Sequence, residues 1–89
     1  MKYVLFYENG DAPRELAQQL YPAHRDRWDE FREAGRLLAI GPFTDGSGAM
    51  GVFTSKAAAE EFAASDPFVL QGVVGAWRVT EWAEAILSP

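Results

Sequence analysis

The chain contains two residues whose types suit acid/base chemistry. His24, the only histidine, stands in the segment YPAHRDRWDEF, and Asp66 directly precedes a proline in SDPFVLQG. A carboxylate that accepts a hydrogen bond from one imidazole nitrogen fixes the tautomer and orientation of the ring and favours the imidazolium. The other nitrogen is then free to take or give a substrate proton. If these two side chains meet in the fold, they would form a general acid/base pair.

The position of His24 favours an inward-facing side chain. On a helix that begins at Pro22, His24 shares a face with Trp28 and Phe31, four and seven residues further on. An inward histidine needs a hydrogen-bond partner, and a backbone carbonyl can serve as well as a carboxylate. From position alone, a core histidine with a purely structural role stays open as an alternative.

Asp66 also has a structural explanation. An aspartate before Pro67 is kept extended by the proline, and its side chain can cap a short following helix, PFVLQG. Its two oxygens allow it to cap that helix and to bind His24 at the same time. Whether the two side chains come within hydrogen-bond reach depends on how the helices pack, and sequence spacing does not establish that distance.

Other kinds of catalytic site find little support. The chain has no cysteine, and its serines occupy loop, cap or tail positions, so a thiol or serine nucleophile is not expected. One histidine without cysteines leaves only carboxylates as further metal ligands, so we expect no metal. The segment GSGAMG has the spacing G-x-G-x-x-G, but it leads into a strand instead of opening a helix, and it indicates a hairpin turn. We expect no cofactor.

Composition limits the partners. With 13 acidic and 8 basic residues among 89, the net charge is -5, and no lysine or arginine cluster is present to bind nucleic acid. No stretch approaches 20 apolar residues, and the N-terminus has no signal-peptide pattern, so we expect a cytoplasmic protein without a membrane partner. Arg14 and Arg78 could bind an anionic substrate, although a surface arginine and a strand arginine paired with a nearby acid are simpler interpretations.

Changes in hydrophobic periodicity divide the chain into strands and helices. The expected elements are a strand over 2–7, a short helical segment over 14–20, a main helix from Pro22 to about Ala34, strands over 36–43 and 48–54, a helix over 56–65 capped by Ser55, and a strand over 75–82. Pro22 sets the start of the main helix because proline suits a first turn and disrupts a helix interior. The order βαββαβ predicts a single domain over residues 1–89 with a ferredoxin-like fold, a four-stranded antiparallel sheet with both helices on one face.

The other face of this sheet is expected to be apolar. Tyr3, Leu5 and Tyr7 fall on one side of the first strand, whereas Val4 and Phe6 fall on the other. Two helices can cover only one side, and a large exposed apolar face marks a site of association. We therefore expect a homodimer in which two sheets pack face to face, with a monomer that tolerates an aromatic face as the alternative.

The segments PAHRDRWDEFREAGRLLAIGPF and SKAAAEEFAASDPFVLQGV, joined by a glycine-rich hairpin, resemble the YciI-like (YCII-related) proteins across essentially the whole chain. The resemblance implies a ferredoxin-like fold, a dimer formed through the sheets as a dimeric α+β barrel, and a candidate active site made of His24 and Asp66. By the same motifs, it assigns Gly41, Pro42 and Phe68 to substrate binding. The family is similar to muconolactone isomerases and includes an enzyme that removes chloride from a chlorinated hydroquinone.

Two functions follow from these observations. The first is a small enzyme that uses His24 and Asp66 for proton transfer, in an isomerisation or elimination on a small organic molecule held in an aromatic-lined pocket between helices and sheet. The second is a non-catalytic dimeric module that binds a metabolite or a partner through the same pocket. The substrate itself is not indicated by the residues.

Overall fold

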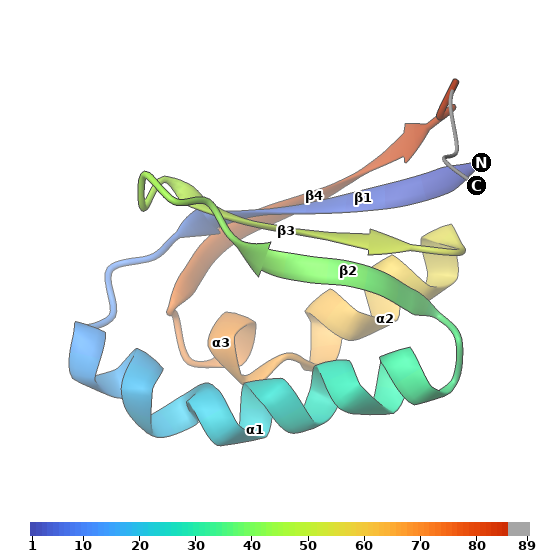
Figure 1. Ribbon diagram of the computed structural model, residues 1–89. Coiled ribbons are helices and arrows are strands. Elements are labelled where there is room, and N and C mark those ends of the chain that lie inside the picture. The colour runs from blue at the N-terminus through green and yellow to red at the C-terminus, as the bar shows by residue number, and fades with distance from the viewer. Residues whose placement is uncertain (86–89) are drawn as a thin grey trace.

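The computed structural model describes residues 1–85, which form a four-stranded antiparallel sheet with helices on one face (Figure 1). Its elements are β1 (Lys2–Asn9), α1 (Arg14–Glu33), β2 (Leu37–Pro42), β3 (Gly48–Phe53), α2 (Lys56–Ser65), α3 (Pro67–Leu70) and β4 (Val74–Trp82). The strand order is β2-β3-β1-β4. The ferredoxin-like fold predicted from the element order is therefore confirmed. The last four residues of the expected domain, 86–89, lie outside the described part of the chain.

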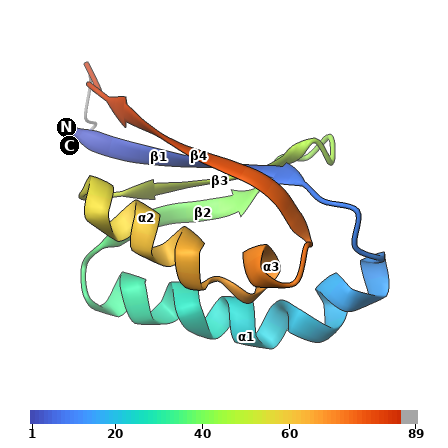
Figure 2. The same cartoon turned by 180° about the vertical axis from the view of Figure 1, so that it is seen from behind.

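The three helices lie on the same side of the sheet, as the two opposite views agree (Figures 1 and 2). Between the layers, the rings of Phe31 from α1, Phe53 from β3 and Phe62 from α2 pack with centroids 5.3 to 6.3 Å apart. Ala58 and Ala59 of α2 are fully buried. Because alanine is small, α2 can approach the sheet closely, and the three phenylalanines fill the space beside it.

The helix that carries His24 begins earlier than the sequence analysis predicted. The expected start at Pro22 is wrong, because α1 begins at Arg14 and includes Pro22 in its interior. An interior proline costs about 3 kcal/mol through its missing N–H and the clash of its ring with the preceding turn. Gln18, whose carbonyl loses its partner, is exposed, so this carbonyl can reach water. Neither α1 nor any other helix within residues 1–85 is long and apolar enough to cross a membrane.

The second helix begins and ends as its local sequence dictates. The Ser55 hydroxyl accepts a 3.1 Å hydrogen bond from the amide of Ala58, which is the expected N-cap. The helix ends at Ser65 because Asp66, the residue before Pro67, adopts extended backbone angles of -70° and 124°. A short helix, α3, follows directly. This break turns the chain so that Asp66 faces the interior, where it is fully buried.

Strand alternation in β1 separates a helix-facing side from an open side. Leu5 and Tyr7 belong to the core beneath the helices, whereas Phe6 lies on the open side together with its cross-strand neighbour Arg78. The Arg78 guanidinium lies over the Phe6 ring, 4.2 Å from its centroid, and donates a hydrogen bond to Thr80. The pairing of Arg78 with an acid is thus not observed: none of the ion pairs among residues 1–85 includes it.

Candidate active site

His24 and Asp66 lie in direct contact between the helices and the sheet. Nδ1 of His24 is 2.7 Å from Oδ1 of Asp66, and the two side chains are 8% and 0% exposed. The histidine comes from the middle of α1 and the aspartate from the break between α2 and α3. Since no other hydrogen bond within residues 1–85 involves this imidazole, Nε2 keeps its capacity for a ligand.

The carboxylate of Asp66 performs two tasks at once. Oδ1 accepts a 3.1 Å hydrogen bond from the amide of Phe68, which caps α3, and the same oxygen contacts His24. Oδ2 accepts a 2.7 Å hydrogen bond from the hydroxyl of Tyr7. All three partners can donate, so the acceptor-only ionised carboxylate matches this environment. Donation from Nδ1 then places the lone pair of the neutral imidazole on Nε2.

Tyr7 is a member of the site that sequence reasoning missed. It projects from β1 on the helix-facing side and is 6% exposed. Burial raises the pKa of its hydroxyl above the ordinary value of 10.0, and the charge of Asp66 and their hydrogen bond raise it further. Tyr7 is therefore a neutral donor at physiological pH. The available signal was its inward position in the strand, since the hydroxyl of a buried tyrosine generally requires a partner.

Aromatic rings hold the imidazole in place on two sides. Phe68 stacks on His24 with ring centroids 4.0 Å apart and planes 4° from parallel. Trp28, one turn along α1, meets the imidazole edge-on at 5.1 Å. These contacts, together with the hydrogen bond to Asp66, restrict rotation of the ring and keep Nε2 in one direction.

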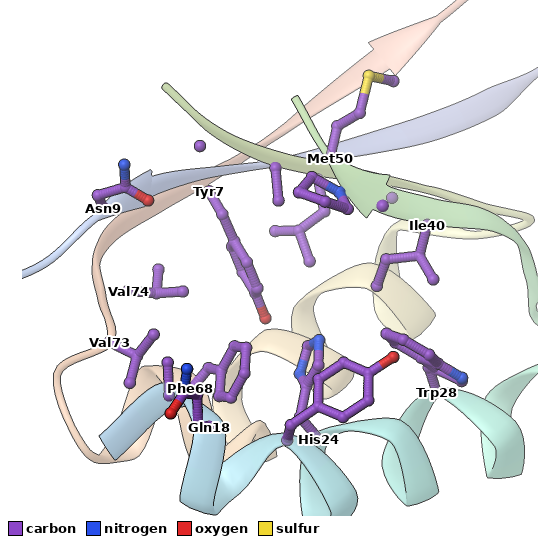
Figure 3. Close-up of a pocket in the computed structure, with 18 of the residues that line it drawn as sticks. Tyr7, Asn9, Gln18, His24, Trp28, Ile40, Met50, Phe68, Val73 and Val74 are labelled. Carbon is purple, nitrogen blue, oxygen red and sulfur yellow. The ribbon is translucent and has the colours of Figure 1, made fainter. Parts of the chain in front are cut away.

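The imidazole borders a pocket of about 720 Å³ between α1 and the sheet. In Figure 3, Tyr7 descends from β1 toward the cavity, while His24, Trp28 and Phe68 approach it from the helices. The pocket is lined by Leu5, Tyr7, Asn9, Arg14, Ala17, Gln18, Tyr21, His24, Trp28, Ile40, Gly41, Pro42, Gly48, Ala49, Met50, Gly51, Phe68, Val73 and Val74. Asp66 is absent from this lining and lies behind His24, so it can act on a ligand only through the pocket residues that it contacts, such as His24 and Tyr7.

The three residues expected to bind substrate all line the pocket. Phe68 forms part of the wall beside His24, and Gly41 and Pro42 belong to the end of β2 across the cavity. Small residues on β3 create the space there, because Ala49 and Gly51 pair with Tyr7 and Leu5 on the helix-facing side of the sheet. A Cβ added at Gly51 would lie 3.0 Å from the Phe53 ring, so this position tolerates little extra volume.

The first turns of α1 supply a wall that the sequence analysis did not predict. Ala17, Gln18 and Tyr21 follow Arg14 by three, four and seven residues, and all four line the pocket. His24 continues the same stripe beyond the proline. This helical periodicity was a signal for an unbroken helix, but the rule against interior proline outweighed it.

Comparison with known proteins relates this chain to a protein family and to solved structures of similar fold. The family model of the YCII-related domain matches residues 1–83. One of the solved structures is 5-chloro-2-hydroxyhydroquinone dehydrochlorinase (TftG) from Burkholderia phenoliruptrix AC1100, in complex with 2,5-dihydroxybenzoquinone. It has a TM-score of 0.77 and 18% sequence identity to this chain, and the match covers 96% of each. This similarity shows a shared fold. No curated protein matches the chain.

Proposed function

Since the chain belongs to the YCII-related family, we propose that it is a small-molecule enzyme in which His24 transfers a proton and Asp66 orients the imidazole. The observation that carries the proposal is the 2.7 Å contact between these two side chains, with the imidazole at the wall of a pocket large enough for a small organic substrate.

His24 acts in this scheme as the base. Because Nδ1 donates to Asp66, Nε2 holds the lone pair that accepts a substrate proton, and the buried carboxylate stabilises the imidazolium that forms. Tyr7 and the amide of Phe68 hold the carboxylate in position through their own hydrogen bonds. The protonated imidazole then returns the proton to the substrate or to solvent.

The reactions that suit a histidine base oriented by an aspartate are isomerisation and elimination. In an isomerisation, the imidazole removes a proton beside a carbonyl and returns it at another carbon. In an elimination, the base takes a proton, the electron pair of the broken bond forms a new π bond, and a leaving group such as chloride departs with its own electron pair. Neither needs a covalent intermediate on the protein, which agrees with the absence of cysteine from the chain.

The dehydrochlorinase of similar fold suggests the first substrate to test. Purified protein is incubated anaerobically with 5-chloro-2-hydroxyhydroquinone, and chloride release is followed beside a wider screen of cyclic ketones and enol lactones. On a substrate that turns over, we expect His24→Gln to lower kcat by about 10² or more while ligand affinity is retained. Arg25→Gln, an exposed neighbour on α1 outside the pocket, is the matched control.

The same variants distinguish the proposed enzyme from the alternative, a non-catalytic binding module. In that case wild-type protein binds ligands without turnover, and His24→Gln alters only affinity. If His24 is purely structural, the variant lowers the free energy of unfolding and leaves turnover of the folded fraction intact. Urea unfolding of each variant therefore accompanies the kinetic assays.

We also propose that the protein is a homodimer whose protomers pack through the open face of the sheet. Phe6 of β1, which pairs with Arg78, and Trp82 of β4, which pairs with Lys2, both lie on this face, and Trp82 is 49% exposed. Val52 continues the apolar surface on β3, where it pairs with Val4. The resemblance to the family supports a second copy of the chain as the partner.

A further inference from the structure

We propose that the pocket selects organic carboxylates and that Arg14 binds the carboxylate group at the end of the pocket away from Trp28. This inference rests on the proposed function in taking the pocket as the substrate site, and it adds the chemical class of the substrate. In this arrangement, His24 contacts the reacting part of the substrate, and Arg14 binds the carboxylate at its other end.

The charge of the pocket lining differs in sign from that of the whole chain. The protein has 13 acidic and 8 basic residues, a net charge of -5. Within the part of the chain that the structure describes, the lining includes one arginine, one histidine and no aspartate or glutamate. The one acid near the site, Asp66, is fully buried behind His24, and Tyr7, His24 and Phe68 occupy its oxygens. An anion in the pocket therefore meets no exposed carboxylate on the wall.

Arg14 is available to bind such an anion. It lies in the first turn of α1 and is exposed to solvent, and it takes part in none of the ion pairs found among residues 1–85. Two other arginines of this helix form ion pairs with acidic residues of α1: Arg27 with Glu30, and Arg32 with Asp29. Of these three arginines, Arg14 is the one that lines the pocket.

The polar side chains of the lining gather at the same end as Arg14. Gln18 lies one turn along α1, and Asn9 lies at the end of β1, where its amide nitrogen donates a 2.6 Å hydrogen bond to the carbonyl of Gly46. Figure 3 shows Asn9 and Gln18 on one side of the cavity, beside Val73 and Val74, and Ile40 and Trp28 on the other, with His24 between them. A ligand with one polar end and one apolar ring matches this division.

The distance along α1 sets the shape of the ligand. His24 lies ten positions after Arg14, or roughly 15 Å along a helix axis, and the long arginine side chain spans part of this length. The anionic group is thus several bonds from the reacting atom. A carboxylate is favoured over a more highly charged group because Arg14 is the only permanently charged cation in the described lining and its planar fork matches a carboxylate.

Calorimetric titration with a matched pair of probes tests this assignment. The probes are 3-(4-hydroxyphenyl)propionate and its neutral amide, 3-(4-hydroxyphenyl)propanamide, which differ only in the charged end. We expect wild-type protein to bind the carboxylate about tenfold more tightly than the amide, and this preference to shrink as salt is raised. Arg14→Gln should reduce the preference to less than about twofold, whereas Arg25→Gln on the exposed side of the helix should keep it.

Three results would overturn the proposal: equal binding of the two probes by wild-type protein, no binding of the carboxylate, or a preference that survives in Arg14→Gln. This titration tests the role of Arg14 independently of the kinetic assays that test the proposed enzyme. His24→Gln is expected to keep the preference for the carboxylate probe, because Arg14 binds the charged group. A protein that prefers the carboxylate but turns over no substrate would therefore refute the proposed enzyme and leave this assignment standing.

Discussion

The hydroxyl of Tyr7 donates a 2.7 Å hydrogen bond to the carboxylate of Asp66, although 59 positions separate the two residues in sequence. Through this contact β1 holds in place the carboxylate that both caps α3 and binds His24. Stability and site geometry are coupled at this point, because removing either group leaves a buried polar partner without its hydrogen bond.

Tyr7→Phe is expected to lower stability at neutral pH and to change its dependence on alkaline pH. Loss of the hydrogen bond to a charged group should cost about 1.5–3 kcal/mol. The folded-state pKa of Tyr7 lies above its ordinary value of 10.0, so its stabilising contribution is complete below pH 10 and declines above it, when the unfolded chain releases the proton and the folded chain retains it. The decline is about 1.4 kcal/mol per pH unit.

Urea unfolding from pH 8 to 11 measures this effect. Tyr3 and Tyr21 are present in both proteins, so their titration cancels when the two free energies of unfolding are subtracted. The difference between wild type and Tyr7→Phe should shrink as the pH rises above 10. A difference that stays constant up to pH 11 would contradict the assignment of Tyr7 as a buried donor.

Asp66→Asn and Asp66→Ala separate the two tasks of this carboxylate. Asparagine keeps the capping oxygen and the shape but removes the charge, whereas alanine also removes the cap, which costs about 1 kcal/mol more. Both variants should lower turnover, and Asp66→Asn should shift the tautomer of His24, as read from its imidazole ¹⁵N chemical shifts. Unchanged shifts in Asp66→Asn would show that Asp66 serves only as a cap.

Ala49→Leu is expected to fill the pocket without loss of the fold. Ala49 faces the cavity from β3 opposite Tyr7, so the added side chain occupies ligand space and should weaken binding of 3-(4-hydroxyphenyl)propionate at least tenfold. The free energy of unfolding should change by less than about 1.5 kcal/mol, because the pocket can hold the added volume. Val52→Leu, on the open face of the same strand, is the control and should leave binding unchanged.

Gly10→Ala should destabilise the protein, whereas Gly41→Ala should not. A Cβ at Gly10 would lie 2.1 Å from the backbone carbonyl oxygen of Gly72, so the chain leading into α1 must move away from the turn before β4. No atom lies within 4 Å of a Cβ built at Gly41. Thermal unfolding should show a loss of about 1–3 kcal/mol for Gly10→Ala and a much smaller change for Gly41→Ala. Equal stabilities would show that the loop adjusts freely.

Trp82→Glu should convert the proposed dimer into a monomer. It introduces a charge on the open sheet face, where burial against a second copy would leave that charge unpaired. Sedimentation equilibrium gives the mass, and circular dichroism checks the fold. Leu70→Glu is the matched control, because Leu70 is 65% exposed on α3, away from the open face. A wild-type protein that is monomeric at 50 μM or above, a concentration we choose for the test, would refute the sheet-to-sheet dimer.

The sequence by itself determined the elements and the direction of several side chains. Alternation placed Leu5 and Tyr7 on the same side of β1, helical spacing turned His24 inward, and Asp66 before Pro67 marked a break and a cap. These features follow from interactions within a few residues, such as backbone restriction by proline, side-chain capping and the periods of strand and helix. They are encoded locally and can be recognised locally.

Only the tertiary structure decided how those side chains combine. α1 continues through Pro22 although proline locally disfavours a helix interior, and the contact of Tyr7 with Asp66 depends on β1 lying beside the end of α2. The pocket arises because small residues of β3 lie opposite the first turns of α1. Such contacts join residues that are far apart in the chain, and their free energy depends on how the layers pack as a whole. They therefore cannot be predicted from any single segment of the sequence.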